Sequence, residues 1–172
     1  MISKYQIILC DTCVIIELFR LNLWESFISI FDVAISGTIV EESMYYIDNQ
    51  KQKHSIDLKI YINNKQIKEV SVSSKSIERL YKDFDPSYQD RLDPGELELL
   101  SYLFDNKNEN IKICSADGIV FKILGRKLMS EKGISLEELL INNFPKKQIR
   151  MQFTKKWKEQ YLQEGLQLSE IK

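Results

Sequence analysis

Acidic residues recur where predicted strands give way to helices. Three short apolar runs are each followed by carboxylates: Asp11 after the first, Glu41 and Glu42 after the second, and Asp117 after the third. In an open parallel sheet, ligands bind outside the carboxyl ends of the strands. These carboxylates are therefore expected to converge on one crevice, although their separation in the chain hides this.

A cluster of carboxylates calls for cations. Its members repel one another, and their pKa values rise unless positive charge is supplied. No Lys or Arg lies within three positions of Asp11 or Asp117. Oxygen ligands without a matching His or Cys set favour Mg²⁺ or Mn²⁺. Such ions can activate water and stabilise a leaving oxygen, so the pattern predicts metal-dependent hydrolysis.

The elements that must position these acids alternate along the chain. Strands are expected in the β-favouring runs 5–10, 32–36, 66–72 and 111–115. Helices are expected at 12–19 with Thr12 as the cap, 38–47, part of 49–64, 73–84, 96–104, 118–124 and 136–141. Short strands separated by helices favour a three-layer α/β/α fold with a mainly parallel central sheet.

Length and composition predict one domain over residues 1–172, in which 145–172 form a basic C-terminal helical extension. With 172 residues and 44% hydrophobic content, the chain can bury a core without disulfides. The net charge of −1 gives no overall attraction to nucleic acid. With no long apolar segment and an odd number of cysteines, we expect a soluble, cytoplasmic protein with reduced thiols and no membrane partner.

Four segments resemble the PIN-domain family in order and spacing, and the likeness covers roughly residues 5–141. They are the strand ending in Asp11-Thr-Cys-Val-Ile-Ile, the run Ile35-Ser-Gly-Thr-Ile-Val-Glu-Glu42, the turn Asp93-Pro-Gly-Glu96 with its apolar helix, and Cys114-Ser-Ala-Asp117. The resemblance implies a metal-dependent nuclease fold with an acidic pocket. Members of that family include toxins of toxin–antitoxin pairs and RNA-processing nucleases.

The resemblance also implies roles for single residues. Asp11, Glu42, Glu96 and Asp117 match the family's four acids, which would hold Mg²⁺ or Mn²⁺, and Ser115 matches a small hydroxyl residue expected to orient a water or phosphate oxygen. The implied function is an endoribonuclease that acts on RNA. The toxin members of the family further imply a toxin that forms a homodimer and is silenced by an antitoxin protein.

Several alternatives stay open at this level. Glu41 could replace Glu42, and Asp93 or Glu98 could replace Glu96. Where the family often carries a further acid or Asn beside its last acid, this chain has Ala116 and Gly118, which weakens the prediction of a second metal ion. Each acid alone also fits a simpler role as a helix cap or first-turn residue. The rival functions are a non-catalytic module that binds RNA or a protein, and a DNA-directed nuclease.

Cysteines and a basic tail raise two further possibilities. Cys10 and Cys13 form a C-x-x-C pair, but the acid between them opposes a thiolate, so all the cysteines are interpreted as small, buried residues. The basic run is either a solvated helix face or a nucleic-acid contact in which Phe153 or Trp157 stacks on a base. Its residues are Lys146, Lys147, Arg150, Lys155, Lys156, Trp157 and Lys158.

Overall fold

A parallel β-sheet forms the centre of the molecule. The computed structural model describes residues 6–42, 44–84 and 86–170. Within these residues, five parallel strands lie in the order β5-β2-β1-β6-β7. Their bounds are β1 Ile7–Cys10, β2 Asp32–Ser36, β5 Lys68–Val70, β6 Ile111–Cys114 and β7 Gly133–Ile134. Residues of β1, β2 and β6 are largely buried, as expected for a sheet covered on both faces.

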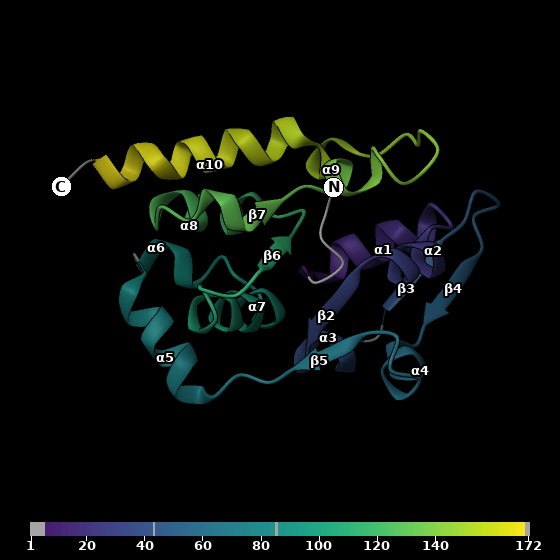
Figure 1. Cartoon of the computed structure of the whole chain (residues 1–172), viewed down its shortest axis with the longest axis horizontal. Coiled ribbons are helices and arrows are strands. Elements are labelled where there is room, and N and C mark those ends of the chain that lie inside the picture. Colours follow the sequence, from purple (N-terminus) through teal and green to yellow (C-terminus); the bar gives the residue numbers. More distant parts are fainter. Residues whose placement is uncertain (1–5, 43, 85, 171–172) are drawn as a thin grey trace.

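Helices flank the sheet on both sides, which agrees with the predicted three-layer α/β/α arrangement. Figure 1 shows α1 (Thr12–Arg20) and α2 (Trp24–Ile30) to one side of the strands, and α5 (Ser74–Asp83), α7 (Pro94–Asp105) and α8 (Gly118–Arg126) to the other. The shorter helices are α3 Gly37–Glu41, α4 Leu58–Asn63, α6 Pro86–Gln89 and α9 Leu136–Leu140, with 3₁₀ turns η1 Ser130–Lys132 and η2 Met151–Phe153.

The direction of the strand connections reverses beside β1. The chain runs from β1 outward to β2 and β5, and then crosses back over β1 to form β6 and β7 on its other side. With right-handed crossovers, the helices that follow β1 and β6 lie on opposite faces of the sheet. The gap between the carboxyl ends of β1 and β6 is therefore the position where open α/β sheets bind ligands. Asp11 and Ser115 directly follow these two strands.

The helix starts explain why acids stand at the strand ends. Asp11 is the N-cap of α1, where its side chain accepts a hydrogen bond from the Val14 N–H. The prediction that Thr12 caps this helix was therefore wrong by one residue. Asp117 caps α8 in the same way, through the Ile119 N–H. These carboxylates satisfy backbone groups that a helix leaves unpaired at its first turn.

The largest error in the predicted elements lies between residues 38 and 64. The expected helix at 38–47 ends at Glu41, and β3 (Met44–Ile47) pairs antiparallel with β4 (Lys53–Ile56). Apolar residues at helical spacing here belong instead to a strand rich in aromatic and β-branched side chains. The Asp48 side chain accepts the N–H groups of Gln50 and Gln52 and so fixes the turn between the strands. Only α4 remains of the helix expected in 49–64.

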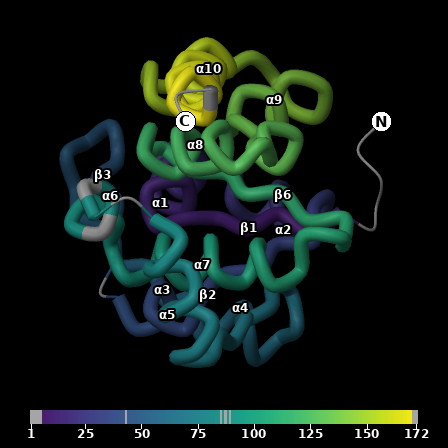
Figure 2. The backbone as a smooth tube through the Cα atoms, turned by 90° about the vertical axis from the view of Figure 1, so that its left-hand side faces the viewer, coloured from purple at the N-terminus to yellow at the C-terminus, as the bar shows by residue number. Residues whose placement is uncertain are grey.

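The C-terminal helix α10 (Lys155–Glu170) lies along α8, as both views of the backbone show (Figures 1 and 2). The predicted helical extension is therefore correct from residue 155, whereas residues 145–150 form no helix and 151–153 form only the turn η2. Glycines permit the close crossing. A Cβ on Gly125 would collide with the Leu162 carbonyl, and a Cβ on Gly165 with the Lys122 carbonyl. In the described part of the chain, no helix is both apolar and long enough to span a bilayer.

Candidate active site

Asp11 is the centre of the site. Its side chain is 3% exposed, and its two oxygens have different partners. Oδ1 accepts the Val14 N–H at 2.8 Å, while Oδ2 accepts the Ser115 hydroxyl at 2.5 Å and the Ala116 N–H at 3.0 Å. Ser115 and Ala116 follow β6, so the hydrogen bonds join the ends of two adjacent strands. The parallel register, in which Cys10 lies opposite Cys114, produces this contact.

Ser115 acts on Asp11 rather than facing open solvent. It is buried, donates its hydroxyl proton to Asp11 and accepts the Asp117 N–H at 3.0 Å. With its proton donated to Asp11, Ser115 does not also donate to a phosphate oxygen, one of the two roles that the resemblance implied, whereas the other role, orienting a water, stays a prediction. Ser115 is therefore a positioning residue for the carboxylates on either side of it.

Glu96 and Asp93 enter the site from the start of α7. They form a capping box in which Asp93 Oδ1 accepts the Glu96 N–H at 2.8 Å and Glu96 Oε2 accepts the Asp93 N–H at 3.3 Å. Glu96 is 6% exposed, whereas Asp93 is exposed. The Glu96 Oε1 and Asp93 Oδ2 atoms accept no hydrogen bond from the described residues. Each acid therefore keeps one oxygen for a ligand. The structure does not decide between Asp93 and Glu96, the alternatives that the sequence left open.

The carboxyl groups of these acids repel one another electrostatically. Burial and the charges of Asp93, Asp117 and Asp11 raise the pKa of Glu96 to about 8. Burial raises the pKa of Asp11 to about 6, with a further contribution from Asp93, against the hydrogen bonds from Ser115, Val14 and Ala116 that lower it. The charges of these carboxyl groups therefore act on one another. We call these four residues, Asp11, Asp93, Glu96 and Asp117, the acidic cluster.

Glu42 lies at the edge of this cluster. Its carboxylate accepts the Thr12 hydroxyl at 2.6 Å, next to Asp11 in sequence, but it is not among the charges that shift Asp11 or Glu96. Glu41 is exposed and forms an ion pair with Lys59 at 3.1 Å. Of the two neighbours, Glu42 is therefore the one that faces the α1 terminus.

Glu98, which the sequence left as an alternative to Glu96, is engaged elsewhere. Its carboxylate accepts the backbone N–H of Thr38 at 3.1 Å and the Thr38 hydroxyl at 2.8 Å. This contact ties the start of α3 to α7. Glu98 is thus a structural link between helices and not a member of the acidic cluster.

The acidic cluster does not form a preformed metal-binding site. Across residues 6–42, 44–84 and 86–170, no three His, Cys, Asp or Glu side chains are grouped so as to hold a metal ion. Each carboxylate of the cluster uses one oxygen to accept a hydrogen bond from a backbone N–H at the start of a helix. Asp93, Glu96 and Asp117 each retain a second oxygen that accepts no hydrogen bond from the described residues. The donor chemistry suits a hard cation, and binding one would require these side chains to turn toward it.

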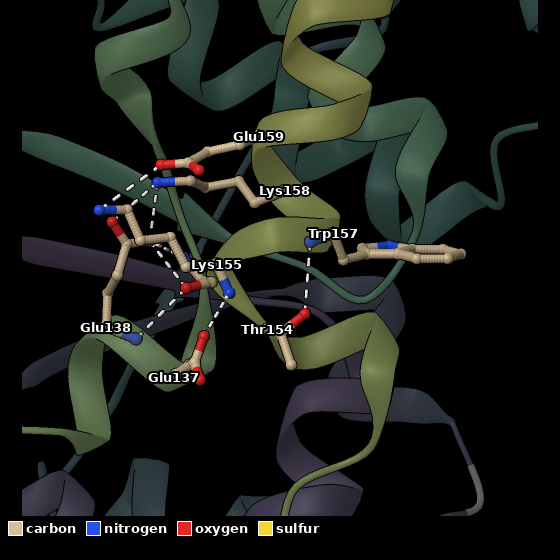
Figure 3. Close-up of polar contacts among 8 residues, drawn as sticks. Glu137, Glu138, Thr154, Lys155, Trp157, Lys158 and Glu159 are labelled. Carbon is tan, nitrogen blue, oxygen red and sulfur yellow. Dashed lines mark hydrogen bonds and ion pairs between the residues drawn. The ribbon is translucent and has the colours of Figure 1, made fainter.

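The basic tail is mostly tied to the protein. Lys158 is 7% exposed and pairs with Glu138, and Lys155 pairs with Glu159 at 3.5 Å. Figure 3 shows the Trp157 ring pointing away from these ion pairs, and its indole N–H is donated to the Ala116 carbonyl at 3.2 Å. Phe153 is buried in the core, so of the two alternatives for stacking on a base only Trp157 stays a prediction. Exposed residues of this run that have no ion-pair partner among the described residues are Lys146, Lys147 and Lys156.

Two features of the site surroundings escaped prediction from the sequence. Cys13 was expected to be buried but is exposed, while Cys10 and Cys114 are buried, and all of these thiols are free. Arg20 and Arg150 both bind the buried carboxylate of Glu17. The signal in the sequence for the Glu17–Arg20 ion pair was a Glu among the apolar positions of α1 with an Arg three residues later.

Comparison with protein-family models, with curated proteins and with solved structures finds no match to this chain. The chemistry of the site therefore has to be inferred from its own residues.

Proposed function

We propose that this chain is a PIN-like, divalent-metal-dependent endoribonuclease that hydrolyses RNA phosphodiester bonds. The observation that carries the proposal is that Ser115 links Asp11 to Asp117 beside the point where the strand order reverses, and that the charges of these two acids act on the buried Glu96. Placing like charges together and burying two of them is unfavourable for folding. Such an arrangement is expected where a cation supplies the missing charge and the carboxylates bind it.

Asp11, Glu96 and Asp117 are the proposed metal ligands, with Asp93 and Glu42 beside them. Bound Mg²⁺ or Mn²⁺ would supply Lewis acidity to a phosphodiester and lower the pKa of water. The protein's own contribution is to fix the carboxylates before substrate arrives. Ser115 holds Asp11 in one rotamer, and the N-terminus of α1 favours its charged form.

Within this function, we propose that the protein works in the cytoplasm as the toxin of a toxin–antitoxin pair. Support comes from the resemblance of the four acid-bearing segments to PIN toxins. A homodimer and a silencing antitoxin protein belong to the same proposal. A neighbouring reading frame that encodes a small DNA-binding protein would support this role, and an isolated gene would weaken it.

The test is cleavage of single-stranded RNA in Mn²⁺ or Mg²⁺, with EDTA as the metal-free control. The wild type should cut, EDTA should stop the reaction, and Asp11→Asn should lower the rate at least about 100-fold, as the loss of about 2.7 kcal/mol of transition-state stabilisation does. Asp57→Asn is the matched control, because Asp57 caps α4 and is not among the charges that raise the pKa of Asp11 or Glu96. Asn is an equally good cap, so both variants should fold. Equal activity of the two variants would exclude the proposal, and the same assay on single-stranded DNA identifies the rival substrate.

A second function has one observation in its favour. The described residues hold no preformed group of three metal ligands, which fits a PIN-like module that binds RNA or a protein without cutting. Metal titration separates the two. A module without catalytic metal should show the same melting temperature in EDTA and in millimolar Mn²⁺.

A further inference from the structure

A pocket of about 500 Å³ lies between α1 and β3, and its lining includes Thr12, the sequence neighbour of Asp11. Thr12, Ile16 and Arg20, one turn apart along α1, form one wall, and the strand β3 forms the opposite wall. Glu42 lies in its lining at the Thr12 end, and Arg150 lines it together with Arg20. Of the predicted metal ligands, Glu42 alone is in the lining, and the capping interactions do not account for this pocket.

A buried carboxylate anchors the arginines of the pocket. Glu17 has a side chain that is 0% exposed. Arg20 approaches it with two nitrogens, Nε at 2.9 Å and Nη2 at 2.7 Å, and Arg150 adds a hydrogen bond from Nη2 at 2.7 Å. Burial alone would raise the pKa of Glu17, but the guanidinium groups outweigh it and hold the pKa below its usual value. Glu17 is therefore ionised and fixes where both arginines lie.

Arg20, Arg150 and Glu17 together carry more positive than negative charge. Two guanidinium groups face the one carboxylate of Glu17, while the Glu42 carboxylate lines the Thr12 end of the pocket, so the excess positive charge is confined to the arginine end. Each guanidinium has five N–H donors, and Glu17 occupies only some of them. The Arg150 side chain is 53% exposed, so its remaining donors are open to a ligand. An anchored pair of guanidinium groups with spare donors is suited to bind a planar or tetrahedral oxyanion.

The pocket also offers apolar surface for the organic part of such a ligand. Ile16 and Met44 contribute to its walls together with Tyr45, Tyr46 and Ile47. Tyr45 and Ile47 remain exposed, 44% and 52% respectively. A free inorganic anion would not need this surface, whereas a nucleotide has both a phosphate and a base to place.

The position of the pocket connects it to the proposed reaction. Thr12 follows Asp11 directly, and Arg20 lies two helical turns further along α1, about 12 Å away along the helix axis. We propose that the pocket binds a nucleotide of the RNA strand next to the cleavage site, with its phosphate on Arg20 and Arg150. Glu17 is then a positioning residue for the arginines. This inference rests on the proposed nuclease function, because that function is what makes the bound RNA a substrate.

The experiment measures binding and cleavage separately. A fluorescent single-stranded RNA is titrated onto the full chain in EDTA over a range of salt concentrations, for the wild type, Arg150→Gln and Arg79→Gln. Arg79 is the matched control, since it is an exposed arginine of α5 that pairs with Asp105. Arg150→Gln keeps a donor for Glu17 and leaves the Arg20 contacts in place, so the variant should fold.

We expect Arg150→Gln to weaken RNA binding roughly tenfold and to lower the slope of log affinity against log salt by about 0.7, the value for one lost phosphate contact with a single strand. In Mn²⁺ its KM should rise by a similar factor while kcat stays near the wild-type value. Arg150→Lys should restore the salt slope but only part of the affinity, because it retains the charge and loses the fork. Arg79→Gln should behave like the wild type in each measurement.

Unchanged affinity and salt slope in Arg150→Gln would overturn the inference, and RNA cleavage by the wild type would still stand. Conversely, Arg150-dependent binding without cleavage by any variant would support the pocket and remove the nuclease proposal. A glutamate-rich peptide serves as competitor. If it binds the wild type but not Arg150→Gln, while RNA binds both equally, the pocket takes an acidic peptide and the inference fails.

Discussion

Gly165 in α10 lies directly against the backbone carbonyl of Lys122 in α8, in a space that no β-carbon could share. Replacing Gly165 with Ala should therefore force the two helices apart. Ala would favour the helix itself by up to about 1 kcal/mol, but overpacking against backbone atoms costs about 1–3 kcal/mol or more. The net effect should be a lower midpoint of urea unfolding with little change in its slope.

Gly37→Ala is the control for this prediction. A Cβ there would meet only the end of the Glu69 side chain, at 3.1 Å, which can move away. Its unfolding midpoint should stay near the wild-type value. If Gly165→Ala were as stable as Gly37→Ala, the close packing of α8 on α10 would be wrong.

Lys158 should be required to anchor α10 on α9. It is 7% exposed and donates to both carboxylate oxygens of Glu138, at 2.8 and 2.7 Å, contacts that Figure 3 draws as dashed lines. Lys158→Met leaves the Glu138 carboxylate without this partner. Hydrogen bonds to charged groups contribute roughly 1.5–3 kcal/mol, so unfolding free energy should fall by about that amount. Adding Glu138→Gln should recover part of the loss, which a double-mutant cycle would measure; strictly additive losses would show that the pair is not coupled.

The same pair predicts an acid-side pH dependence. Burial alone would raise the pKa of Glu138, but hydrogen bonds from Lys158 and Ser135 outweigh it and leave the pKa below its usual value of 4.5. A lowered carboxyl pKa contributes stability above pH 4.5 that is lost as the pH falls through the folded-state value. Urea unfolding from pH 6 down to pH 3 should show a smaller loss of stability in Lys158→Met than in the wild type. Equal losses would contradict this assignment.

The acidic cluster predicts the opposite trend at higher pH. The raised pKa values of Asp11, about 6, and Glu96, about 8, mean that the folded state binds more protons than the unfolded chain. Their contribution is complete below about pH 4 and is lost as the pH rises through 6 and 8. In EDTA, the melting temperature should fall between pH 5 and pH 9. Glu96→Gln should flatten the decline, whereas Glu131→Gln on the exposed turn η1 should leave it unchanged.

Divalent cations should oppose that decline if the cluster binds them. A ligand specific for the native state stabilises it by about 2.7 kcal/mol at a hundredfold excess over Kd. Because protons compete for the carboxylates, Mn²⁺ should raise the melting temperature more at pH 8.5 than at pH 5.5. In Asp11→Asn the response should shrink. A wild-type melting temperature that ignores Mn²⁺ at both pH values would rule out a metal site in the cluster.

Cys13 should be an unreactive thiol despite its exposure. Although the residue is exposed, its sulfur is partly removed from water, and this desolvation together with the charges of Asp11, Glu96, Asp93 and Asp117 raises its pKa to about 12. Since the thiolate is the reactive form, alkylation at pH 8 should be much slower than for an ordinary exposed cysteine. Asp117→Asn should speed the reaction by removing one of the repelling charges. Rapid labelling of the wild type, located by peptide mapping, would contradict this charge environment.

The sequence was most informative where a strand ends in an acid. The apolar runs before Asp11 and Asp117 predicted β1 and β6, and the rule for parallel sheets brought the carboxylates to one edge. The β3–β4 hairpin was missed because Ile39, Met44 and Ile47 are spaced as on a helix, although the last two belong to a strand. Periodicity over so few residues cannot distinguish the two structures.

Contacts between distant residues were beyond any local pattern. Arg150 and Glu17 are 133 positions apart, and nothing near either residue indicates the other. The same holds for Lys158, which a run of basic residues suggested was solvated but which packs against Glu138, 20 positions earlier. Which charges of a surface run are neutralised depends on how helices dock, and docking is decided by packing rather than by charge order.

The bond between Asp11 and Ser115 joins residues 104 positions apart. As the chain leaves the ribosome, β1 can pair with β2 early, but its other edge has no neighbour until β6 has been made. Over that interval Asp11 lacks Ser115, and Glu96 and Asp117 have not yet joined it. The acidic cluster can therefore be completed only after Asp117 has been synthesised, more than 100 residues after Asp11.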